Sequence, residues 1–110
     1  MKRYCLTLDL QDDAEKIKQY EEHHKKLWPE ITGSIRESGV LNMEIYRWKT
    51  RLFMVMDVDD SFSFEKKKLA DEHNPAVQKW EQLMWNYQQG LPGAGAGEKW
   101  VLMNKIFELE

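Results

Sequence analysis

Residues 41–59 read LNMEIYRWKTRLFMVMDVD, and this stretch predicts an antiparallel hairpin. Two strand-like runs, 41–48 and 51–59, are joined by Lys49-Thr50, and a two-residue loop is a common connection between antiparallel strands. Apolar side chains occur at successive positions of the second run, so they lie on both of its faces. The hairpin therefore predicts a sheet whose two faces both need to be covered.

The segment before the hairpin predicts one strand and then a helical region that is broken once. Apolar side chains alternate with others from Tyr4 to Leu10, as in a half-buried strand. The pair Asp12-Asp13 can cap the helix that follows, whereas Pro29 suits the first turn of a new helix. We therefore expect a break just before this proline and a second helix that ends at Gly39.

The segment after the hairpin predicts two further helices. Ser61 or Ser63 can cap a short helix over residues 62–71. Asn74 followed by Pro75 is a typical start for the next helix, because the side chain caps it and proline fits its first turn.

The last part of the chain predicts a connection and a final strand. We expect the preceding helix to end at Gly90. Residues 91–97, LPGAGAG, then form a flexible connection rather than a phosphate loop, since no strand leads into them and no Lys-Ser/Thr follows. Residues 98–109 alternate with apolar side chains on both faces and predict a strand.

In chain order these elements are β-α-β-β-α-β, with each helical region broken once. This is the ferredoxin-like α+β plan, in which a four-stranded antiparallel sheet carries its helices on one face. We expect one domain over residues 1–110. The other sheet face would be bare although the hairpin is apolar on both sides. A second subunit packed sheet to sheet would cover it, which predicts a homodimer in the form of a dimeric α/β barrel.

Charge and hydropathy argue against two classes of partner. The 110 residues carry 16 Lys+Arg against 19 Asp+Glu, a net charge of −3, and without a basic stripe we expect no nucleic acid partner. The longest strictly apolar run, 52–56, is far shorter than the about 20 residues that cross a bilayer, so we expect no membrane partner. A single cysteine, Cys5, rules out an internal disulfide and fits a reducing, cytoplasmic compartment.

Tyr20, His24 and Trp28 lie at a spacing of four, which places all three side chains on one helix face. That face is the apolar stripe, which should turn inward. One interpretation is a core histidine that bonds a backbone carbonyl, with the other two rings filling space. The alternative is a proton-transfer site, favoured because Leu and Ile would fill the same volume without polar atoms. His24 is the inward candidate whose ordinary pKa lies near neutrality.

Other positions are weaker candidates for the same site. Trp80 lies in the middle of the last helix's stripe, as a core residue or as a platform for the apolar face of a sugar ring. Met43 shares a strand face with other apolar residues and is a core residue by default. His23 lies about 100° around the helix from His24, so we expect it to face solvent or a rim.

The chain lacks the motifs of metal, nucleotide and cofactor chemistry. Its 3 histidines occur without HExxH or paired cysteines, so no metal site is predicted. GxGxxG and Walker sequences are absent, and we expect no cofactor. The chemistry that fits the inward His and Tyr is proton transfer on a small neutral ligand.

At this point the residues resemble the L-rhamnose mutarotases, a family of small dimeric α+β proteins. The likeness covers nearly the whole chain and includes Tyr20-x-x-x-His24, Trp28-Pro29-Glu30, Gly39, Asn42, Ile45-Tyr46, the strand 52–58, Gln78-x-Trp80 and Ile106-Phe107-x-Leu109. It implies an isomerase that interconverts the α and β anomers of a 6-deoxyhexose monosaccharide, L-rhamnose first. It also implies that His24 transfers the proton and that Tyr20 and Trp80 line the sugar site, with Trp28 beside them.

One position departs from that family. Its enteric-type members carry a site tyrosine directly after the asparagine that matches Asn42, and this chain has Met43 there. Met43 is therefore expected to contact the substrate in that tyrosine's place. Its presence implies either another acid-base partner, Tyr20 or Tyr46, or another sugar, with L-fucose as the first to consider.

Two other functions stay open on the sequence alone. A dimeric α+β barrel monooxygenase or haem-degrading protein would share the fold and could bind haem through His24. A ligand-binding or purely dimerising module without turnover would use the aromatic residues as core and interface.

Overall fold

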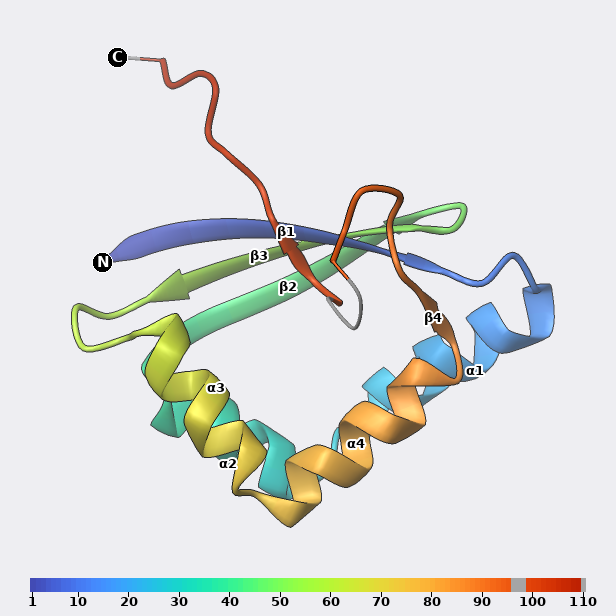
Figure 1. The fold of residues 1–110 in the computed structure, drawn as a ribbon, viewed down its shortest axis with the longest axis horizontal. Helices are drawn as coiled ribbons and strands as arrows, with labels where there is room; N and C mark the ends of the chain where they lie inside the picture. Colours follow the sequence, from blue (N-terminus) through green and yellow to red (C-terminus); the bar gives the residue numbers. More distant parts are fainter. Residues whose placement is uncertain (96–98, 110) are drawn as a thin grey trace.

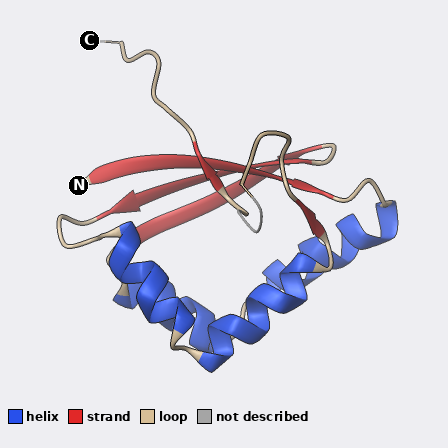
Figure 2. Ribbon diagram, in the orientation of Figure 1, coloured by secondary structure: helices blue, strands red, loops and turns tan. Residues whose placement is uncertain are grey.

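The computed structural model of the protein describes residues 1–95 and 99–109. Within them an antiparallel sheet carries helices on one of its faces (Figures 1 and 2). The elements in chain order are β1 (Lys2–Leu10), α1 (Ala14–Lys25), α2 (Pro29–Glu37), β2 (Val40–Trp48), β3 (Arg51–Val58), α3 (Phe64–Glu72), α4 (Pro75–Trp85), β4 (Gln88–Gln89) and β5 (Val101–Leu102). The predicted α+β class and ferredoxin-like order are confirmed. No helix in this described part is long and apolar enough to cross a membrane.

β1 is the central strand of the sheet. It pairs antiparallel with β3, from Lys2 opposite Val58 to Asp9 opposite Arg51. β2 lies beyond β3, and the turn between them has Lys49 at a left-handed φ of 53°. The short strands β4 and β5 both pair with the other edge of β1. The β2–β3 pairing confirms the predicted hairpin.

Alternate side chains of the central strands meet the helices and form the core. The buried apolar residues of β1 and β3 are Leu6, Leu8, Leu10, Leu52, Met54, Met56 and Val58. The helices contribute Tyr20, Ile31, Val77, Trp80 and Met84 to the same layer. Full burial of one aliphatic side chain of this size stabilises the fold by about 1.5–3 kcal/mol. Two of these buried residues, Tyr20 and Trp80, carry polar atoms, and both lie at one end of the layer.

No helix in the described chain covers the other face of the sheet (Figure 2). Tyr46 and Trp48 lie on this bare face with 55% and 72% of their surface exposed. Arg3 donates to the Asp57 carboxylate at 2.8 Å on the same side of the sheet. The predicted alternation of the hairpin is therefore confirmed, and its aromatic face is open.

Side-chain caps and a proline set the helix starts. Asp13 accepts hydrogen bonds from two backbone N–H groups in the first turn of α1. Ser63 and Asn74 cap α3 and α4 in the same manner. Pro29 is the first residue of α2, so the helical region is broken where the sequence predicts.

The end of α4 differs from the prediction. The helix ends at Trp85, whereas the sequence predicted an end at Gly90. Tyr87 N–H still bonds the Met84 carbonyl, and the chain then enters the sheet with Gln88 paired to Leu10. Pairing with the free edge of β1 ends the helix before the glycine is reached.

The predicted strand over 98–109 is also wrong in extent, and its first residue lies outside the described residues. Only Val101–Leu102 pair with β1, and Met103 N–H makes a last bond to the Cys5 carbonyl. Residues 103–109 then leave the body of the molecule on the side away from the helices (Figure 1). Ile106, Phe107 and Leu109 are 95%, 75% and 85% exposed. Their alternation resembles that of a strand, but nothing within one described chain covers them.

A bulge between Val40 and Asn42 moves one residue of β2 off its expected face. Met43 and Ile45 pack against the core as predicted. Leu41 is 60% exposed, although period-two spacing placed it beside them. An extra residue in a strand stays unpaired and shifts the alternation, which explains the difference.

Candidate active site

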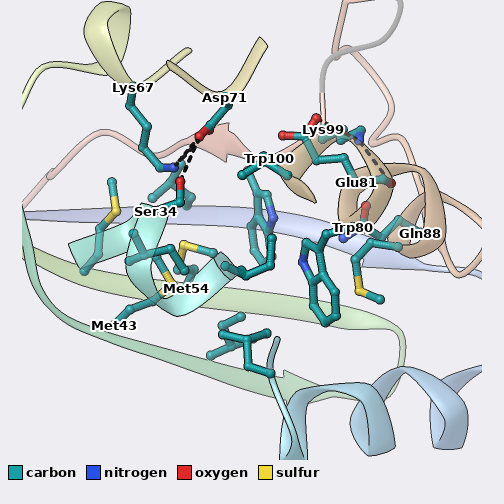
Figure 3. A pocket seen from close by; sticks show the side chains of 18 of the residues that line it. Ser34, Met43, Met54, Lys67, Asp71, Trp80, Glu81, Gln88, Lys99 and Trp100 are labelled. Atoms are coloured by element: carbon teal, nitrogen blue, oxygen red, sulfur yellow. Dashed lines mark hydrogen bonds and ion pairs between the residues drawn. The ribbon is translucent and has the colours of Figure 1, made fainter. Parts of the chain in front are cut away.

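A pocket of about 540 Å³ lies between the helices and the sheet (Figure 3). Its walls come from α1, α2, α3 and α4, from the hairpin and from the segment that contains Trp100. Tyr20, His24, Met43 and Trp80 all line it, so the structure brings four of the predicted site residues together. Pockets of this size hold small organic ligands.

His24 enters the pocket from α1 in a defined protonation state. Its Nδ1 lies 2.9 Å from the Tyr20 carbonyl oxygen, which can only accept a hydrogen bond. Nδ1 therefore carries the proton, and Nε2 is the basic nitrogen of the neutral ring. Burial lowers the pKa of His24 below its ordinary value, and nearby His23 lowers it further, against the opposing effect of the carbonyl bond. The ring is thus a neutral base at physiological pH.

Tyr20 provides a neutral hydroxyl next to this base. Its side chain is 3% exposed, and its ring centroid lies 4.4 Å from that of His24. Burial raises the pKa of Tyr20 above its ordinary value, although a hydrogen bond from Gln88 opposes the shift. Gln88 Nε2 donates to the Tyr20 oxygen at 3.3 Å, so the phenol proton is free to be donated elsewhere. The pair offers one acceptor and one donor.

Trp80 forms an aromatic wall beside the pair. Its ring lies 5.5 Å from His24 and 5.2 Å from Trp28, edge to face in both contacts. Trp28 does not line the pocket but packs behind Trp80. The structure therefore places Trp28 as a support for a predicted site residue, one layer away from the cavity.

Met43 and His23 were two further candidates, and the structure places them differently. Met43 lines this pocket and also a second one of about 400 Å³, which it shares with His24 and Asn42. His23 is half-buried, and its Nε2 lies 3.2 Å from the Tyr87 hydroxyl. This position agrees with the predicted rim and not with full exposure to solvent, because Tyr87 from the segment after α4 contacts the ring.

Several polar residues of the pocket were not predicted from the sequence. Lys67 and Asp71 of α3 form an ion pair at 2.9 Å, and Ser34 donates to the same carboxylate at 3.3 Å (Figure 3). Figure 3 shows this group across the pocket from Trp80 and Gln88. The Lys67–Asp71 spacing of four on a helix was a usable signal for this ion pair.

Gln88 was missed for another reason. The predicted helix continued to Gly90, so Gln88 stood on a helical surface and not in the sheet. Figure 3 shows Trp100 next to Trp80. The sequence predicted apolar side chains on both faces of the segment that contains Trp100, so it did not indicate which of them face the helices. Within residues 1–95 and 99–109, no group of three His, Cys, Asp or Glu side chains lies close enough to hold a metal ion.

The structure is that of a small ferredoxin-like protein whose pocket is lined by His24 and Tyr20, with their rings close together. The chain belongs to the L-rhamnose mutarotase family, whose model matches residues 3–109. The protein is thus a sugar mutarotase, an isomerase of carbohydrates. This membership favours the mutarotase expectation over the haem-binding and non-catalytic alternatives.

Relatives of known name cover nearly the whole chain. An L-fucose mutarotase of Xanthomonas campestris pv. campestris is 42% identical over 99% of this chain and 89% of its own length. An L-rhamnose mutarotase of Enterococcus faecalis is 27% identical over 98% of this chain and 97% of its own. The crystal structure of an L-rhamnose mutarotase from Formosa agariphila, 21% identical, superposes with a TM-score of 0.74 over 100% of both chains, which supports the fold.

Proposed function

We propose that the protein interconverts the α and β anomers of L-fucose, with L-rhamnose as the second sugar to test. The more similar of the two named relatives is the L-fucose enzyme, and Met43 stands where a family tyrosine was expected. Both sugars are 6-deoxyhexoses with a free hydroxyl at C1. The observation that carries the proposal is the neutral His24 and Tyr20 pair on one pocket wall.

The mechanism follows from hemiacetal chemistry. His24 Nε2 takes the proton from the C1 hydroxyl, and the Tyr20 hydroxyl gives its proton to the ring oxygen. The C1–ring oxygen bond breaks and the open-chain aldehyde forms. Rotation about C1–C2 presents the other face of the aldehyde, and the reverse proton transfers close the ring as the other anomer. No electrons are exchanged, and both residues regain their starting protonation.

The aromatic and polar parts of the pocket suit a sugar. Trp80 offers a flat apolar surface for the apolar face of the ring, as indoles do for partly polar ligands. The Lys67–Asp71 pair and Ser34 lie across the pocket, where they meet hydroxyl groups. Met43 contributes an apolar contact on the sheet side. Each of these roles belongs to the proposal.

Two-dimensional NMR exchange at the anomeric protons tests the function. We expect exchange cross-peaks with L-fucose when the protein is added, and weaker ones with L-rhamnose. General acid-base catalysis contributes about 10²–10⁴-fold, so His24→Gln should lose a factor in that range. His73→Gln is a matched control, because His73 makes the same Nδ1 bond to the carbonyl four residues back but is exposed. Spontaneous rates with both sugars would make the proposal untenable.

We also propose that the active form is a homodimer. The bare face exposes Tyr46 and Trp48, and the segment 103–109, which leaves on that side of the sheet, carries four more exposed apolar side chains. A second copy packed against this face would cover both and close a dimeric barrel. A cytoplasmic location stays a prediction from the single Cys5.

A further inference from the structure

Gln88 has a polar atom without a partner. Its side chain lines the pocket and is 6% exposed. Nε2 donates to the Tyr20 hydroxyl, whereas the buried Oε1 accepts no hydrogen bond from any described residue. Leaving a buried acceptor unpaired is costly, and native structures contain few such groups. A donor from outside the chain would remove this cost.

The fold holds this amide in place. Gln88 pairs with Leu10 at the edge of β1, so its backbone is fixed by the sheet. Its Nε2 is engaged by Tyr20, which fixes the side chain as well. Figure 3 shows Gln88 beside Trp80 at the wall of the pocket. An occupant of the pocket is therefore the group best placed to bring a donor to Oε1.

We propose that Gln88 is a sugar-binding residue whose Oε1 accepts a hydrogen bond from the C2 hydroxyl of the bound 6-deoxyhexose. This inference rests on the function proposed above. In that mechanism the C1 hydroxyl gives its proton to His24, and the ring oxygen has no proton to give. Because the same amide holds Tyr20, Oε1 lies next to the reacting centre. The C2 hydroxyl is the remaining donor on a carbon adjacent to C1.

The proposal makes Gln88 a specificity residue. L-fucose and L-rhamnose have opposite configurations at C2 and at C4 and are otherwise alike. An acceptor fixed near C2 therefore bonds one of the two sugars better than the other. The N–H of the same amide positions Tyr20, since a phenol oxygen that accepts this bond directs its own proton away from Gln88.

The test compares two variants with two sugars. Gln88→Met keeps a side chain of similar length but has no hydrogen-bonding amide, and Gln89→Met is the matched control at the exposed neighbouring position of β4. The sugars are L-fucose and 2-deoxy-L-fucose. Exchange NMR gives kcat/KM and calorimetry gives the binding constant, so turnover and binding are measured separately.

We expect wild type and Gln89→Met to bind 2-deoxy-L-fucose roughly 10- to 100-fold more weakly than L-fucose, as for loss of one bond to a buried acceptor. Gln88→Met should bind L-fucose about as weakly as wild type binds 2-deoxy-L-fucose. Its affinity for 2-deoxy-L-fucose should be no lower than its affinity for L-fucose. Losses that multiply would mean that Gln88 and the C2 hydroxyl act independently, which overturns the proposal. Equal binding of both sugars to wild type overturns it without any variant.

A second variant separates the two roles of the amide. Gln88→Glu keeps an acceptor for C2 but offers Tyr20 a carboxylate oxygen instead of an N–H. The phenol proton then turns toward Glu, so kcat should fall more than tenfold while KM changes less than threefold. An unchanged kcat would overturn the positioning role. If the protein binds L-fucose better than the 2-deoxy sugar but does not interconvert its anomers, Gln88 is kept as a binding residue and the mutarotase mechanism is rejected. If the protein interconverts the anomers and Gln88→Met does not change the rate, only the role of Gln88 is rejected.

Discussion

Burial shifts the pKa values of His24 and Tyr20 in opposite directions. Burial disfavours the charged form of either group, so it lowers the pKa of the histidine and raises that of the tyrosine. Both side chains are therefore neutral over a wide range of pH. One accepts a proton and the other donates one, which is the pairing that reversible opening of a hemiacetal requires.

The pH dependence of kcat/KM should show this at the residue scale. We expect a plateau that extends below about pH 6.5, the ordinary pKa of histidine, and a fall only at lower pH, when His24 becomes protonated. The alkaline limb should lie above about pH 10, because Tyr20 keeps its proton longer than a free tyrosine. A rate profile measured by anomeric exchange, corrected for spontaneous mutarotation, checks both limbs. An acidic midpoint above 6.5 contradicts the assignment of His24 as base.

Stability should respond to the same histidine. The unfolded chain binds a proton at His24 at a higher pH than the folded protein does, so acidification favours the unfolded state. The free energy of unfolding should therefore fall as the pH drops below about 6.5, and this slope should shrink in His24→Gln. Urea titrations at a series of pH values measure the effect. Gln82→Ala, an exposed change that alters no titratable group, should keep the wild-type slope.

Tyr20→Phe separates the hydroxyl from the ring. The variant keeps the aromatic contact with His24 but loses the donor and leaves Gln88 Nε2 without an acceptor. We expect kcat to fall by about 10²-fold or more. The free energy of unfolding should drop by about 1–3 kcal/mol. Tyr4→Phe, at a half-buried ring that does not line the pocket, is the control for both readouts, and equal rates for the two variants would remove Tyr20 from the mechanism.

At the scale of elements, α4 depends on its cap. Asn74 Oδ1 accepts hydrogen bonds from Ala76 and Val77 N–H, at 3.1 and 3.3 Å. Asn74→Ala should cost about 0.5–2 kcal/mol of stability, measured by urea unfolding. Gln82→Ala, an exposed change on the same helix, should cost nothing measurable. Because α4 carries Trp80, a loss of sugar affinity is expected to accompany the loss of stability.

The elements that the sequence predicted well have local signals. Asp13, Pro29 and Asn74 act on the backbone within one turn, and their helices begin where expected. The errors arose where distant pairing decides the structure. Gln88 leaves the helical path to pair with β1, and the strand predicted over residues 98–109 finds a partner for only two residues, Val101 and Leu102.

The candidate site follows the same division. Tyr20, His24 and Trp80 were predicted from helical spacing, because a residue on an apolar stripe turns inward whatever lies opposite. Gln88 could not be predicted in this way, because its place depends on an edge pairing with a strand far away in the chain. Its unpaired oxygen is a property of the assembled pocket and leaves no trace in the local sequence.

At the scale of the whole molecule, the bare sheet face should join two copies. Size-exclusion chromatography with light scattering should give wild type twice the mass of a 13.2 kDa chain. Trp48→Glu should shift the protein toward the monomer, because the new carboxylate would be buried in the contact without a partner. Lys18→Glu, an exposed change on α1, should leave the dimer intact. A monomeric wild type would contradict the dimer proposal.

The central place of β1 also bears on how the chain folds as it is synthesised. Leu6 pairs with Met54 on one side and with Leu102 on the other, so the earliest strand waits for partners made much later. A nascent chain that has emerged only as far as α2 lacks β3 and β5, so β1 has neither of these strands to pair with. Long-range pairing of this kind slows folding. Assembly of the pocket, which has Trp100 beside Trp80, therefore waits for a segment made much later than α1, so Tyr20 and His24 are synthesised well before the cavity that they line is complete.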